Sequence, residues 1–174
     1  MKSQTKEPDQ QLIAKILAFE LDDPGASLSF TSRLAREQAW THVFAARVIE
    51  EYNRFIALAM VAGHPVTPSE EVDQAWHLHL VYTRSYWHDL CRDTLGQDLH
   101  HGPTKGGSDE GEKFHDWYSK TLESYQRIFK EKAPLDIWPA PADRFAHPGA
   151  GRWIDSSKFW LLTRPRLWQK LFRK

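Results

Sequence analysis

The sequence has very little cysteine and no long apolar run. Cys91 is the single cysteine in 174 residues, which excludes an intramolecular disulfide framework and any zinc finger built on several cysteines. No window approaches the about 18 consecutive apolar residues of a membrane-spanning helix. The N-terminal string MKSQTKEPDQQ lacks the apolar core of a secretory signal. A lone thiol also fits a reducing compartment, so we expect a cytoplasmic protein.

The chain also lacks net charge and the common catalytic motifs. Its 23 Lys and Arg balance 23 Asp and Glu, and 41% of its residues are hydrophobic, which is typical of a folded domain rather than a disordered chain. The missing basic excess argues against a generic nucleic-acid binder. There is no G-x-S-x-G, H-E-x-x-H, G-x-G-x-x-G or P-loop string. The sequence therefore assigns no catalytic residue.

Helical periodicity dominates what is present and predicts an all-α fold. Apolar residues recur at helical spacing, or helix signals cluster, over residues 8–20, 32–38, 44–62, 67–81, 86–95 and 109–129. Thr67 fits the N-cap and Glu70 the N3 position of a capping box, and Ser32 fits the start of the short second helix. We predict a compact bundle of about five helices within residues 1–133.

The C-terminal part differs from this bundle in composition. Four prolines with aromatic residues between them predict an extended segment over residues 134–157 that lies over the bundle. Residues 152–174 then carry seven Lys and Arg and one Asp, a local charge of +6, and the preceding residues hold −6. The zero net charge is thus a sum of an acidic body and a basic tail.

The tail, residues 158–174, has the pattern of a basic amphipathic helix. Its apolar side would carry Leu167, Trp168, Leu171 and Phe172, opposite Arg166 and Lys170. Such a segment is typical of a surface that binds an anionic membrane or a partner protein. It equally fits a tail that docks on the chain's own acidic body. Nucleic acid is the weakest of these partners because the body is acidic.

Histidines gather in the centre of the chain, where Asp73 and His77 form an i, i+4 pair on one helix. A carboxylate in this position can fix the tautomer of a metal-bound or catalytic histidine, and it can equally tie two helices together. His77 and His79 lie about 160° apart on a regular helix, so they cannot serve one ion. His79, on the apolar side, is typical of a core residue.

A second histidine pair, His100 and His101, begins a loop over residues 97–108 that contains proline and glycines. Irregular loops of roughly a dozen residues are often functional. If this loop folds back over the helix of Asp73, one of the two histidines completes an Asp/His/His set. Such a set suits a divalent metal such as Zn²⁺ or another first-row ion.

These central residues resemble a known family. The pattern is V-D-x-x-W-H-x-H, a downstream Tyr and Cys, then L-G and a histidine pair, here Val72, Asp73, Trp76, His77, His79, Tyr86, Cys91, Gly96, His100 and His101. Over residues 30–141 the chain is similar to the glycine-rich domain-containing protein-like family. That family is essentially uncharacterised, so the resemblance implies no activity or substrate. With 9 glycines in all, the chain has no glycine-rich tail like that of the plant members, and their RNA-related roles do not carry over.

Two functional hypotheses follow. In the first, the chain is a helical interaction module whose Asp73 and His77 face organises the core, with Cys91 as a small buried residue. In the second, it is a small metal-dependent enzyme of the hydrolase type, in which Asp73, His77 and one of His100 and His101 bind an ion that activates water.

Overall fold

The fold is all-α in a computed structural model that describes residues 7–102 and 108–144. The described residues form seven helices and no strand, namely α1 (Glu7–Leu17), α2 (Phe30–Gln38), α3 (His42–Val61), α4 (Glu70–Val81), η1 (Ser85–Leu95), α5 (Ser108–Phe129) and α6 (Pro141–Arg144). The prediction of an all-α bundle is confirmed, and the predicted number of about five helices is too low. None of the described helices is long and apolar enough to cross a membrane.

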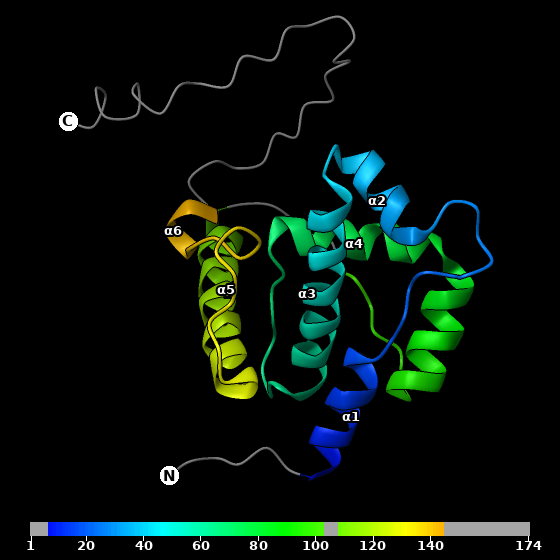
Figure 1. Ribbon diagram of the computed structural model, residues 1–174. Coiled ribbons are helices and arrows are strands. Elements are labelled where there is room, and N and C mark those ends of the chain that lie inside the picture. The colour runs from blue at the N-terminus through cyan, green and yellow to red at the C-terminus, as the bar shows by residue number, and fades with distance from the viewer. Residues whose placement is uncertain (1–6, 103–107, 145–174) are drawn as a thin grey trace, which may run out of the picture.

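Helix α3 stands at the centre of the bundle, in contact with α1, α2, α4 and α5 (Figure 1). Thr41 caps the N-terminus of α3, and its hydroxyl accepts a hydrogen bond from the Phe44 amide at 3.2 Å. The middle of the predicted apolar stripe is buried, with Val48, Tyr52 and Phe55 no more than 1% exposed, while its two ends are partly exposed. The helix therefore forms the inner wall against which the helix of Asp73 and His77 packs.

Two helices begin at a different hydroxyl residue from the predicted one. Helix α4 is capped by Ser69, which accepts from the Val72 amide at 3.2 Å, rather than by Thr67. Helix α2 is capped by Ser29, which accepts from the Ser32 amide at 3.1 Å, so Ser32 lies inside the helix. In both places two hydroxyl residues lie close together, and apolar spacing does not decide which one keeps the extended backbone that a cap requires.

The helix predicted over residues 86–95 is present, but it is a π-helix. In this rare form the backbone bonds join residues i and i+5, and η1 keeps it for 11 residues. Gly96 ends it with φ of +72°, a left-handed backbone that suits glycine. The buried residues of η1 are Tyr86, Leu90, Cys91 and Leu95, so Tyr86 and Cys91 lie five residues apart, as do Leu90 and Leu95. In Figure 1, η1 is the unlabelled green helix beside α1.

The described part of the predicted extended segment, residues 134–144, is not extended. Its backbone turns at Pro134, whose carbonyl accepts from the Ile137 and Trp138 amides, and it ends in the single-turn helix α6. The turn places Ile137 and Trp138 inside the bundle, and the Trp138 indole donates to Glu51 at 2.9 Å. Burial of this large indole outweighs the preference of a proline-rich string for extended backbone. The predicted amphipathic tail lies outside the described residues.

Candidate metal centre

Helix α4 presents Asp73 and His77 side by side. The buried residues Val72 and Trp76 direct one side of the helix into the bundle, which leaves Asp73 and His77 at its edge. His77 Nδ1 lies 3.4 Å from Asp73 Oδ2, one turn away. The His77 side chain is 51% exposed and that of Asp73 is 26% exposed, so the pair opens towards solvent on one side.

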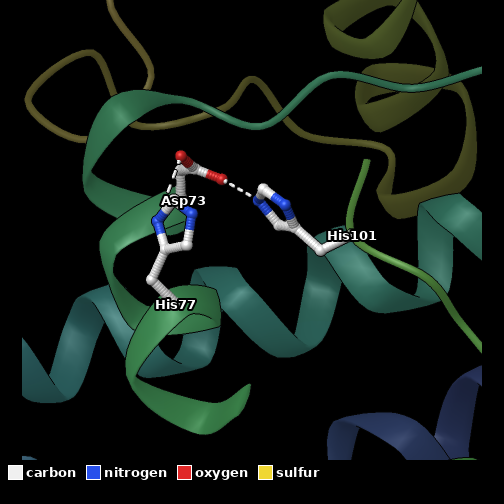
Figure 2. Close-up of side chains that lie close together, drawn as sticks. All are labelled: Asp73, His77 and His101. Atoms are coloured by element: carbon white, nitrogen blue, oxygen red, sulfur yellow. Dashed lines mark hydrogen bonds and ion pairs between the residues drawn. The ribbon is translucent and has the colours of Figure 1, made fainter. Parts of the chain in front are cut away.

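His101 reaches the same carboxylate from a separate segment of the chain. Its Nε2 lies 2.8 Å from Asp73 Oδ1, while His77 lies next to the other carboxylate oxygen (Figure 2). The His101 ring lies edge-on to the Trp76 indole, with centroids 4.5 Å apart, and its centroid is also 4.5 Å from that of His77. One carboxylate thus stands between two imidazoles that are 24 residues apart in the sequence.

These three side chains could hold a metal ion. One ligand atom from each of Asp73, His77 and His101 can be chosen so that all lie within 4.8 Å of one another. A bound Zn²⁺ has nitrogen and oxygen ligands at about 2.0–2.2 Å, so ligands of one ion lie no more than about 4 Å apart. Side-chain rotations that move the ligand atoms by about an ångström would therefore bring them within reach of one ion. Imidazole and carboxylate donors suit Zn²⁺ and Fe²⁺ better than Ca²⁺ or Mg²⁺.

The arrangement also works as a hydrogen-bonded cluster. An ionised carboxylate accepts several bonds, and an N–H of each histidine can donate to a separate oxygen of Asp73. In that state the cluster ties the segment after η1 to helix α4. Metal binding would replace these bonds with coordination, so the same three residues serve both states.

His79 has a structural place away from this centre. It is fully buried, with Nδ1 2.8 Å from the Tyr52 hydroxyl and Nε2 3.1 Å from the Ser85 hydroxyl. Burial lowers the pKa of His79 to about 4, so the ring is neutral at physiological pH. The aromatic rings of Phe19 and Phe30 pack against it. His77 and His79 thus face opposite sides of α4.

His100 does not join the group of Asp73, His77 and His101, although the sequence offered it equally with His101. It is exposed, and its ring packs against Trp87 of η1 with centroids 5.7 Å apart. Adjacent residues of an irregular segment point in different directions, and here the backbone turns His101 inward.

The comparison with known proteins supports the resemblance seen in the sequence. The family model described as UCP032817-like matches residues 28–115, about half of the chain and all of the candidate centre. The chain belongs to this UCP032817-like family. It is also 24% identical over 105 residues to glycine-rich domain-containing protein 1 of Arabidopsis thaliana, which covers 58% of this chain. The chain spans 13% of that relative's length. No solved structure matches the present chain.

Several other residues of the sequence pattern, Trp76, Tyr86 and Cys91 among them, lie behind the centre, in the core. Trp76 is 7% exposed and packs against Phe55, and its indole donates to the Tyr86 hydroxyl at 3.0 Å. Cys91 is fully buried, and burial raises the pKa of its thiol, as expected for a small core residue rather than a nucleophile.

Sequence reasoning missed one position near the centre, Leu99. Its backbone contacts Tyr86 and Cys91, and it lies two residues before His101. The side chain of a leucine gives no signal of this role, because the backbone carries the polar contacts.

Proposed function

We propose that this protein is a metal-binding helical interaction module, in which Asp73, His77 and His101 hold a divalent first-row metal such as Zn²⁺. The observation that carries the proposal is the convergence of two histidines, one from α4 and one from the segment after η1, on opposite oxygens of one carboxylate. The metal would fasten that segment to the bundle and fix the local surface.

The different exposure of the two histidine side chains supports a ligand role. His101 is 16% exposed and has the Trp76 ring beside it, so its ring is held in place before any ion arrives. Such preorganisation lowers the entropic cost of binding. His77 is half exposed, which gives an ion a route to the site from solvent. One side of the centre is thus ordered and the other is open.

Two hollows of the described surface lie away from the candidate centre. One hollow of about 530 Å³ lies between α3 and the segment after α1, and another of about 710 Å³ lies on the outer face of η1. Neither is lined by Asp73, His77 or His101.

A metal-dependent hydrolase is the second candidate, favoured by the exposure of His77. Three protein ligands with solvent on one side leave a coordination position for water, and a bound ion can lower the pKa of that water to about 7. The interaction module and the hydrolase share the metal site and differ in turnover.

Metal analysis of the tag-free full-length chain tests the proposal. We expect one equivalent of bound metal after incubation with Zn²⁺ and gel filtration, and its loss in His77→Ala. His88→Ala is the control, because His88 is an exposed histidine of η1 near Arg92 and away from the centre. A wild-type chain that retains no metal, or a His77→Ala variant that retains a full equivalent, would overturn the proposal.

Hydrolysis assays separate the two candidates. The zinc-loaded chain is incubated with p-nitrophenyl phosphate and p-nitrophenyl acetate, before and after EDTA. We expect no turnover above that of free Zn²⁺. EDTA-sensitive turnover that disappears in His77→Ala would show the hydrolase instead.

A further inference from the structure

We propose that the π-helix η1 is a clamp that positions His101: Tyr86 and Cys91 together hold the backbone of Leu99, and thereby place His101 beside Asp73. This inference deepens the proposed metal site and rests on it for one of its readouts. Tyr86 and Cys91 touch no metal ligand directly in this scheme, so they are positioning residues.

Both backbone groups of Leu99 lie against side chains of η1. The Tyr86 hydroxyl donates to the Leu99 carbonyl, and the Leu99 amide lies close enough to the Cys91 sulfur to lower the pKa of its thiol, against the effect of burial. Both side chains are fully buried, so solvent does not compete for these contacts. A residue held through both its amide and its carbonyl has a fixed peptide orientation on either side. His101 follows only two residues later.

The winding of η1 explains how two of its residues reach one partner. Tyr86 and Cys91 are five residues apart, which on an α-helix would separate their directions by about 140°. In a π-helix the backbone bonds join residues five apart, so such residues lie close to each other along one side. The rare helix therefore has a specific consequence here, since it brings a hydroxyl and a thiol to the same peptide.

The clamp is also tied to the helix that carries Asp73. The Tyr86 hydroxyl accepts a hydrogen bond from the Trp76 indole at 3.0 Å while it donates to Leu99. Trp76 lies between Asp73 and His77 on α4, and its ring contacts His101. One phenolic oxygen thus links α4, η1 and the segment of His101, so the two halves of the centre are set relative to each other through Tyr86.

Conservative substitutions test the clamp. Tyr86→Phe removes only the oxygen, and Tyr82→Phe is its control, because the Tyr82 ring packs against Phe30 away from Leu99. Cys91→Val removes the sulfur acceptor at similar volume, whereas Cys91→Ser keeps an acceptor. Circular dichroism and thermal unfolding of each variant establish that it is folded. If Tyr86→Phe does not fold, the comparison of Cys91→Val with Cys91→Ser carries the test.

Two readouts are taken on each folded variant. The first is the nuclear Overhauser effect between the His101 ring and the Trp76 indole in the metal-free chain. We expect it in the wild type, Tyr82→Phe and Cys91→Ser, and expect its loss in Tyr86→Phe and Cys91→Val. The second is the affinity for Zn²⁺, which we expect to fall about 10–100-fold in those two variants, as when a residue that orients a metal ligand is removed.

The outcomes separate the clamp from the metal site. Unchanged Overhauser effects and zinc affinity in Tyr86→Phe and Cys91→Val would overturn the clamp and leave the metal site standing. A wild-type chain that binds no Zn²⁺, but whose His101–Trp76 contact disappears in both variants, would overturn the metal site and support the clamp.

Discussion

At the scale of single residues, His77 and His79 show how two positions of one helix acquire different chemistry. His77 is half exposed beside a carboxylate, while His79 is enclosed by aromatic rings and two hydroxyls. The angle between them follows from helical geometry, so the sequence was sufficient to predict that both could not serve one ion. Their partners outside α4 were not predictable, because they come from α3, η1 and the segment of His101.

The buried place of His79 gives the stability of the protein a pH dependence. The unfolded chain has an ordinary histidine pKa near 6.5, whereas burial lowers the pKa of native His79 to about 4. Between these values the unfolded state binds more protons, so stability is complete above pH 6.5 and is lost as the pH falls towards 4. We expect the free energy of unfolding to fall by about 2–3 kcal/mol between pH 7 and pH 4.5 because of this residue.

Urea unfolding at the two pH values measures this effect. His79→Gln keeps hydrogen-bonding groups but does not titrate, so its free energy of unfolding should fall less with pH than that of the wild type by about 2–3 kcal/mol. An equal fall in both proteins would show that His79 does not carry this pH dependence.

The choice of His101 over His100 marks the limit of residue-level reasoning. The sequence predicted that one histidine of this pair completes the set with Asp73 and His77 if their loop folds back over that helix, and it gave no reason to prefer either histidine. In the clamp that we propose, the backbone orientation at Leu99 decides between them through its contacts with the buried Tyr86 and Cys91 side chains. A leucine gives no pattern from which this could be inferred.

At the scale of elements, the helix positions were predictable and several of their ends were not. Apolar spacing located α3 and α4, because burial of one face is what makes a helix stable in a small bundle. Caps depend on the backbone of one residue, so nearby hydroxyl residues compete. The π-winding of η1 left a trace in the sequence, since Tyr86, Leu90 and Leu95 are separated by four and five residues.

The corrected start of α4 has a measurable consequence. Ser69 caps the helix, so Ser69→Ala should lower the free energy of unfolding by about 1 kcal/mol. The buried Thr67 hydroxyl oxygen has no hydrogen-bond partner among the described residues, so Thr67→Val should be neutral or stabilising. Chemical denaturation of both variants measures the difference. If Thr67→Val lowered the free energy of unfolding more than Ser69→Ala does, Thr67 rather than Ser69 would be the residue that caps the helix.

At the scale of the whole molecule, the all-α class followed from periodicity, while the joining of distant segments did not. Trp138 enters the core and bonds Glu51, 87 residues away in the sequence. Proline content alone predicted an extended segment there, because it says nothing about which aromatic side chain finds a place inside. The candidate centre depends on the same kind of long-range contact, since His101 meets Asp73 from 28 residues away.

The charge distribution of the chain supports a prediction about the tail. Residues 158–174 hold six basic residues and no acidic one, so the remaining chain carries a net charge of −6. We propose that this tail binds anionic surfaces. The full chain should sediment with vesicles that contain phosphatidylserine at low salt, and a chain truncated at residue 157 should not, because charge attraction and insertion of Trp and Phe are both lost. Equal sedimentation of both chains would exclude membrane binding by the tail.

The most direct test of the metal site is a calorimetric titration with Zn²⁺ of three tag-free proteins: the wild type, the His101→Ala variant and the His100→Ala variant. These adjacent histidines have the same local sequence, but only His101 contacts Asp73. We expect His100→Ala to bind one Zn²⁺ as the wild type does, and His101→Ala to bind it at least about tenfold more weakly. Equal affinities in the two variants, or no binding by the wild type, would contradict the account.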